Sequence, residues 1–163
     1  IVRLVGSEMC IRDRLNFLFD NDPSLETYIQ YTKNPFRKFN KRELIGLGAR
    51  FNLENNFKAG IGVMNEDEED LLGVTDDTLR LSSYFHSEFL IDENIVFDLS
   101  AFVQPALSSF SDYKATLIGQ FDFHVNENFK ISLQYNTFYD SKPPSNAVKK
   151  EEGFATVFSY NFN

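Results

Sequence analysis

Apolar and polar residues alternate along most of this chain, in stretches of about ten residues each. In the stretch 43–53, apolar side chains stand at every second position from Ile45 to Leu53, and Arg50 and two glycines lie between them. Period two is the pattern of a β-strand whose two faces meet different surroundings. We therefore predict an all-β fold. The predicted full strands are 25–31, 43–53, 57–64, 79–91, 95–103, 113–125, 129–139 and 154–162, after a partial strand at 15–19.

The connections between these strands alternate in length. Those at 54–56, 92–94 and 126–128 are tight turns of about three residues. Longer polar loops are predicted in between, at 34–41, 65–77, 105–112 and 141–151. Short turns at one end and long loops at the other are typical of outer-membrane barrels. The pattern thus predicts an antiparallel up-and-down meander that forms an outer-membrane-type β-barrel.

The same alternation would suit a soluble barrel with its apolar face inside, so the direction of that face needs separate evidence. The predicted strands approach the roughly nine to eleven residues that cross a bilayer. Aromatic residues mark strand ends, as an interfacial girdle requires. Inside the strands, charges and histidines keep to the other face, which favours an apolar face toward lipid and a polar lumen. The candidate lumen-lining residues are Arg50, Lys58, Arg80, His86, Glu88, Asp98, Lys114, Asp122, His124 and Lys130. The alternative is a soluble lipocalin-like barrel that binds an apolar ligand.

The first fourteen residues, IVRLVGSEMCIRDR, do not share the rhythm of the strands. They resemble translated sequencing-adaptor read-through, so we treat 1–14 as non-native and 15–163 as one barrel domain, incomplete at its N-terminus. An odd strand count agrees with a missing start, because single-chain bacterial barrels have even strand numbers. Cys10, the only cysteine, lies in this excluded segment.

Composition narrows the function classes. The formal net charge is −8, which argues against nucleic-acid binding, because that function needs a basic face to neutralise phosphates. The chain contains 18 phenylalanines and 7 tyrosines, and aromatic residues are frequent in β-strands. No apolar run approaches the roughly 18 residues of a helical membrane span.

Several segments of the second half resemble a known family. RLSSYF at 80–85, QPALSSFSDYKA at 104–115 and YNTFYDSKPPSNAVKKEEG at 135–153 are similar to the YdiY-like, salt-induced outer-membrane protein family, domain of unknown function 481. NPFR at 34–37 is similar to an upstream element of the family. The resemblance covers about residues 24–163 and implies a location in the outer membrane of a Gram-negative bacterium, with no known chemistry. Its most distinctive loop residues are Gln104, Pro105, Asp112, Tyr113, Asp140, Ser141, Lys142, Pro143 and Pro144.

Candidate chemistry is sparse. His86 and His124 could form a metal or acid–base site with Glu88 and Asp122 on the polar face, but no ligand spacing supports it. Ser82, Ser83 and Ser87 lie near His86, yet no G-x-S-x-G elbow is present. We therefore expect no enzyme activity, no catalytic residue, no cofactor and no metal ligand.

The acidic run at 66–70, together with Asp76 and Asp77, is predicted to be a solvated external loop that could bind divalent cations. The sequence thus predicts an outer-membrane β-barrel with a structural, stress-related or small-solute role. The expected partners are outer-membrane lipids and the barrel-assembly machinery.

Overall fold

A computed structural model describes residues 9–17, 22–34, 39–53, 56–144 and 147–161. These residues form nine strands. The strands are β1 (Met9–Phe17), β2 (Ser24–Asn34), β3 (Phe39–Asn52), β4 (Phe57–Asp70), β5 (Thr75–Asp92), β6 (Ile95–Ala106), β7 (Ser109–His124), β8 (Phe129–Asp140) and β9 (Lys150–Tyr160). The described residues contain no helix long and apolar enough to cross a membrane.

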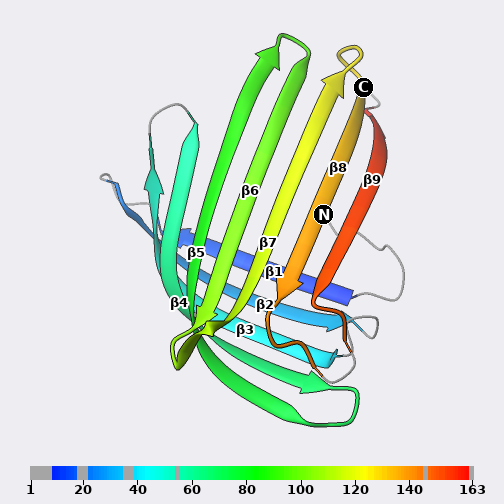
Figure 1. Ribbon diagram of the computed structural model, residues 1–163. Coiled ribbons are helices and arrows are strands. Elements are labelled where there is room, and N and C mark those ends of the chain that lie inside the picture. Colours follow the sequence, from blue (N-terminus) through cyan, green and yellow to red (C-terminus); the bar gives the residue numbers. More distant parts are fainter. Residues whose placement is uncertain (1–8, 18–21, 35–38, 54–55, 145–146, 162–163) are drawn as a thin grey trace.

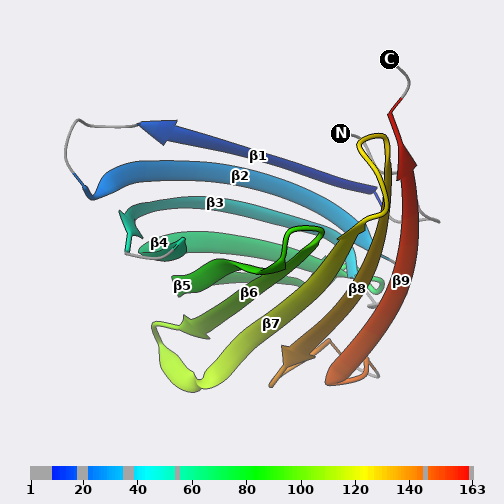
Figure 2. The same ribbon diagram turned by 90° about the horizontal axis from the view of Figure 1, so that it is seen from above.

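The nine strands make one sheet in the order of the chain, and each strand pairs antiparallel with the next. The predicted antiparallel up-and-down meander is therefore confirmed. The sheet curls strongly, so that β1–β3 run behind β6–β8 across a concave interior (Figure 1), and the view from above shows the same curvature (Figure 2). β1 and β9 are its two edges, and no ladder joins them within the described residues. The fold is that of a barrel wall whose sheet is not closed.

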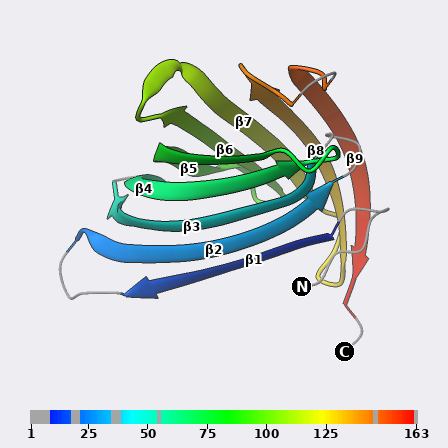
Figure 3. The ribbon, with the colours of Figure 1, turned by 90° about the horizontal axis from the view of Figure 1, so that it is seen from below.

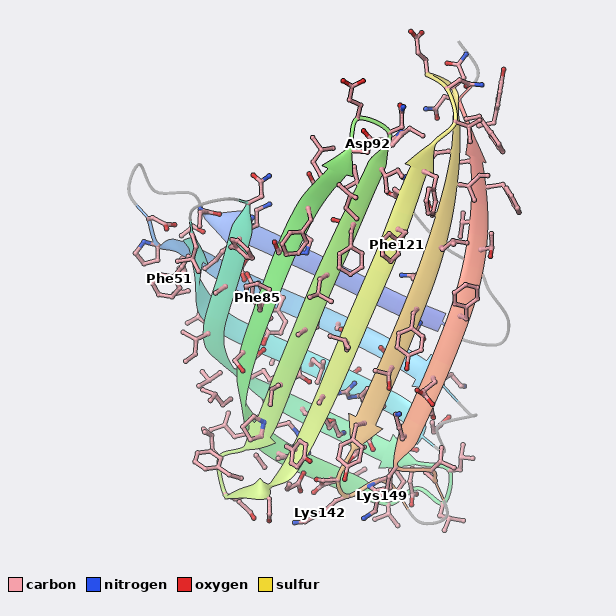
Figure 4. All side chains as sticks on the ribbon, turned by 45° about the horizontal axis from the view of Figure 1, so that its top comes forward. Phe51, Phe85, Asp92, Phe121, Lys142 and Lys149 are labelled. Carbon is pink, nitrogen blue, oxygen red and sulfur yellow. The ribbon has the colours of Figure 1, made fainter. Side chains whose placement is uncertain are left out.

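Burial is inverted relative to a soluble protein. Among the described residues, only Leu44, Met64 and Ala106 are buried hydrophobic side chains, whereas Glu26, Arg80 and other polar groups are buried. Large apolar side chains are exposed on the convex face, among them Ile45 at 59 % of its surface. The apolar face of the alternation therefore points outward and the charged face lines the interior. Figure 4 shows the side chains of this wall, with Phe85 and Phe121 on its outer, convex side.

Aromatic rings gather near both ends of the convex face. Toward the end with the tight turns, the rings of Phe89, Phe97 and Phe121 form a continuous row, with centroids 6.0 Å and 4.5 Å apart. At the other end, the rings of Tyr113 and Tyr139 lie 5.4 Å apart. Two aromatic bands with aliphatic residues between them match the girdles of a membrane barrel.

The long loops predicted at 65–77 and 105–112 are wrong. β4 continues to Asp70 and β5 begins at Thr75, so only four residues, 71–74, connect them. Likewise β6 reaches Ala106 and β7 begins at Ser109. The charged residues extend the strands because they keep the alternation. Glu66 is buried on the concave face, whereas Asp67 is on the convex face, where it pairs with Asp77 of β5. The loop at 141–149 is retained between β8 and β9.

The first strand begins inside the segment that the sequence analysis set aside. β1 pairs with β2 from Met9 opposite Lys33 to Phe17 opposite Leu25. The partial strand predicted at 15–19 is thus a nine-residue strand, shifted toward the N-terminus. Residues 35–37 of NPFR, the turn residues 54 and 55, and position 162 of the last predicted strand lie outside the described residues.

Glycines allow the sheet to bend at β3 and β4. Gly48 and Gly62 are directly opposite, and a Cβ on Gly62 would stand 2.4 Å from the carbonyl oxygen of Leu47. No side chain fits at such an approach, so the two backbones come close only because both residues are glycine. Nearby, the ring of Tyr28 fills the space above Gly46. These contacts occur on the concave face, where curvature crowds the side chains together.

Candidate functional site: a buried charge cluster in the interior

The centre of the candidate site is the carboxylate of Glu66, which is only 2 % exposed. Arg42 Nε on β3 donates to Glu66 Oε1 at 2.9 Å, and Lys114 Nζ on β7 donates to the same oxygen. Arg80 Nε on β5 lies 2.6 Å from Glu66 Oε2, as an ion pair without hydrogen-bond alignment. Three cations from three strands therefore surround one buried carboxylate.

Further carboxylates complete the balance of charge. Lys114 Nζ lies 2.8 Å from Glu68 Oε2 and 3.6 Å from Asp140 Oδ2. Arg80 Nη1 donates to Asp112 Oδ1 at 3.0 Å. We call this set the charge cluster, and its members are Arg42, Glu66, Glu68, Arg80, Asp112, Lys114 and Asp140. Three positive and four negative groups give it a formal charge of −1, which Lys142 at 3.5 Å from Asp112 offsets.

The two glutamates of the cluster differ in their electrostatics. Burial raises the pKa of Glu66, but Arg42, Lys114 and Arg80 together outweigh burial and hold that pKa well below its ordinary value. Burial also raises the pKa of Glu68, and there Lys114 does not compensate, so the pKa stays above its ordinary value. Asp67, the residue between them, is charged and points to the convex side. We therefore place both groups beyond the apolar part of the convex face. The surrounding cations therefore favour the charged form of Glu66, whereas burial favours the neutral form of Glu68.

A polar cavity of about 370 Å³ lies next to the cluster in the interior. Its lining includes the amides of Gln30, Gln104 and Asn136 from β2, β6 and β8. Strands far apart in the sheet therefore face one another across it. Arg42 and Phe138 also line a second void of only about 20 Å³, toward the 141–149 loop. Glu68, Lys114 and Asp140 of the cluster also line this small void.

The residues that carry the family resemblance meet at this place. Asp112 binds Arg80, and the backbone N–H of Tyr113 donates to Ser141 Oγ at 2.8 Å. Asp140 contacts Lys114 and accepts the backbone N–H of Lys142 at 2.9 Å. The remaining members adjoin them: the carbonyl of Gln104 accepts from Arg80 at 3.3 Å, Pro105 pairs with Tyr113, and Pro143 and Pro144 line the small void.

A second polar contact spans β2 and β5. Tyr84 donates its hydroxyl to the carboxylate of Glu26 at 2.8 Å, and Arg50 Nη1 lies 3.7 Å from Glu26 Oε1. Glu26 is as deeply buried as Glu66. This contact links strands that are not neighbours in the sheet, so it stabilises the curvature.

The other predicted lumen residues lie toward the end with the tight turns. Lys130 Nζ donates to Asp122 Oδ2 at 3.0 Å, and His86 Nδ1 lies 2.9 Å from Ser100 Oγ. Glu88 and Asp98 are directly opposite across β5 and β6. Lys58 faces His86 across β4 and β5, and His124 is exposed at the end of β7. Arg80 and Lys114 belong to the charge cluster and Arg50 to the Glu26 contact, so the structure divides the predicted set among three places.

Sequence reasoning missed four central residues: Arg42, Glu66, Glu68 and Glu26. The sequence-based prediction places Glu66 and Glu68 in an exposed loop. Their alternation with Asp67 and Glu69 was the available signal, because it continues the period of β4. Within the described residues, no group of three or more His, Cys, Asp or Glu side chains is placed to hold a metal ion. Cation binding at 66–77 stays a prediction, as does the absence of catalysis.

Comparison with known proteins supports the same type of fold. A family model described as a protein of unknown function, DUF481, matches residues 11–162. No curated protein matches the chain. Among solved structures, the NanC porin in a rhombohedral crystal form is similar with a TM-score of 0.61 and 8% sequence identity, and the match covers 95% of this chain and 79% of that chain. At this identity the likeness concerns the fold alone.

Proposed function

This chain belongs to the DUF481 family of proteins of unknown function, and we propose that it is an outer-membrane β-barrel that lets small polar solutes pass. The observation that carries the proposal is the inverted burial: charged side chains such as Glu66 and Arg80 are buried, whereas large apolar side chains cover the convex face. In water this arrangement would expose an extensive apolar surface at a high cost in free energy. A bilayer removes that cost.

The interior supports a polar solute rather than an apolar ligand. The cavity of about 370 Å³ is lined largely by amides, two hydroxyls and charged groups. Amide and hydroxyl groups bind small solutes rich in hydrogen-bonding groups, whereas an apolar ligand would leave them without partners. This disfavours the soluble lipocalin-like alternative. The likeness to a porin fold is consistent with a lumen but does not identify a solute.

The proposal also assigns partners. The apolar belt would contact the lipids of the outer membrane, and insertion of such a sheet would require the barrel-assembly machinery. The two aromatic bands would lie at the two membrane interfaces.

The test is made on the chain expressed with an outer-membrane export signal. We expect it in the outer-membrane fraction, with a gel mobility that changes on boiling because membrane barrels resist SDS until heated. Proteoliposomes that contain it should swell in a small sugar faster than empty vesicles. Recovery in the soluble periplasmic fraction would contradict the membrane assignment.

A purely structural or stress-related barrel is the second candidate, and the charge cluster favours it because it obstructs the interior. Insertion and heat-dependent mobility without any swelling, in the wild type and in every interior variant, would support that role over solute passage.

A further inference from the structure

We propose that the charge cluster is a removable barrier, which closes the interior at the end of the β4–β5 hairpin and opens when Lys114 separates from Glu66 and Glu68. The inference rests on the proposed function, since a barrier has meaning only for a lumen that solutes enter. It assigns the control of passage to particular side chains.

The cluster bridges the interior instead of following the sheet. Glu66 and Glu68 belong to β4 and Lys114 to β7, and β5 and β6 lie between these strands in the sheet. In Figure 1 the β4–β5 hairpin bends below the lower ends of β7 and β8, and the view from below shows it running across that end of the sheet (Figure 3). The ion pairs with Lys114 therefore hold the hairpin across the opening.

The space around the cluster changes as a barrier requires. The cavity of about 370 Å³ is bordered by Arg42, and a void of only about 20 Å³ is lined by Arg42, Glu68, Lys114 and Asp140. Arg42 and Phe138 line both spaces, so the same side chains separate the cavity from the void. A solute in the cavity would meet the charge cluster before the 141–149 loop.

The hairpin also carries its own repulsion. Asp67 is directly opposite Asp77, and Glu68 is directly opposite Asp76, across β4 and β5. Like charges at opposed positions destabilise a strand pair. Arg80 belongs to the hairpin itself, whereas Arg42 on β3 and Lys114 on β7 bind it from other strands, and Lys114 is the one that lies across the interior. Loss of the Lys114 charge should thus weaken the attachment of the hairpin to β7, which then depends on the contact of Arg80 with Asp112.

The experiment compares vesicle swelling for the wild type, Lys114→Met and Lys130→Met. Both substitutions replace a lysine by a side chain of similar length, but Lys130 pairs with Asp122 at the other end of the interior. Arabinose and the trisaccharide raffinose serve as small and large probes. We expect Lys114→Met to swell several-fold faster than the wild type and to admit raffinose. The Lys130→Met variant should behave as the wild type.

A second pair of variants covers the case in which Lys114→Met does not fold. Glu68→Gln removes one arm of the barrier and leaves Glu66 with its three cations, so it should fold and swell faster than the wild type. Glu69→Gln changes a carboxylate on the other face of the same strand, where Glu69 accepts from Asn40, and it should keep the slow rate. Heat-dependent mobility identifies the folded fraction of each variant.

The outcomes separate the barrier from the proposed function. Variants that fold and swell at the wild-type rate overturn the barrier and leave passage intact. Inserted protein that passes neither sugar in any variant overturns both the barrier and passage. Failure of the wild type to insert overturns the membrane assignment itself.

Discussion

The ring of Tyr84 occupies the space that a side chain of Gly60 would need. The two residues are directly opposite across β4 and β5, and a Cβ on Gly60 would stand 2.0 Å from Cε1 of Tyr84. Because the glycine leaves this space open, the tyrosine lies over β4 and its hydroxyl reaches Glu26 on β2. The sheet is thus tied across its concave face by a contact that depends on a missing side chain.

Gly60→Ala should destabilise the protein, because the new methyl group must displace the Tyr84 ring from its position above β4. Overpacking of this kind costs about 1–3 kcal/mol. Denaturant-induced unfolding in lipid vesicles, followed by circular dichroism, measures the loss. Gly119→Ala is the matched control: its nearest neighbour would be the Phe97 ring at 3.6 Å, an ordinary contact, so little change is expected. Equal losses in both variants would show that strand geometry, and not the tyrosine, decides the cost.

Tyr84→Phe keeps the ring above Gly60 and removes only the hydroxyl that donates to Glu26. A hydrogen bond to a buried carboxylate contributes about 1.5–3 kcal/mol, and we expect a loss of that order in the free energy of unfolding. A Tyr84→Phe variant as stable as the wild type would mean that Arg50 alone satisfies Glu26.

Leu117→Lys places a charge in the middle of the convex face, where the wild-type leucine is 39 % exposed. If this face meets lipid, the substitution should cost about 2–4 kcal/mol and reduce insertion into vesicles. Gln120→Lys puts the same charge on the concave face near Asp122, where it should be tolerated. A soluble protein would give the reverse order, since an exposed lysine is harmless in water.

Acidification from neutral pH should raise the stability of the fold, although it removes the charge of Glu68 from the cluster. The pKa of Glu68 is raised by burial beyond the lowering by Lys114, so folding favours its protonated form. This contribution to stability is present below the ordinary carboxyl pKa of about 4.3 and is lost as the pH rises through the higher folded value. The wild type should therefore gain stability over Glu68→Gln as the pH falls from neutral toward that value.

Glu66 provides the control for this pH dependence. Its pKa lies well below the ordinary value, because its three cations outweigh burial. Its contribution is then present above the ordinary pKa and is lost only at much lower pH. Denaturant unfolding should show a constant difference between the wild type and Glu66→Gln over the same range. A difference that shrinks there would place the titration on Glu66 instead.

The strands and the direction of their faces could be predicted from the sequence, because alternation is a local property. Ile45 and Leu47 on one side of β3, and Gly46 and Gly48 on the other, already define which face points outward and which bends inward. The position of strand ends was harder. A run of acidic residues after Val63 resembles a loop when each residue is judged by polarity alone, but it continues the strand because its alternate members find cations inside.

The charge cluster could be predicted only in part, because its pairs join distant segments. Arg80 and Lys114 were recognised as interior residues from their own strands. Their partner Glu66 lies on β4, and its contact with Lys114 requires the curvature of the whole sheet. Nothing local to 104–115 or 135–153 indicates that Asp112, Asp140 and Ser141 converge on one place. The family segments mark that place without revealing its chemistry.

The inverted burial has a consequence for how this sequence can change over time. In the proposed membrane location the convex side chains meet fluid hydrocarbon and have no fixed neighbours to fit, so leucine, isoleucine, valine and phenylalanine should exchange there with little effect. The concave side chains are held by specific partners, and a change at Glu66 demands an answering change at Arg42, Arg80 or Lys114. Substitutions on the convex face should therefore conserve hydrophobicity but not residue identity. On the concave face, substitutions should occur in pairs.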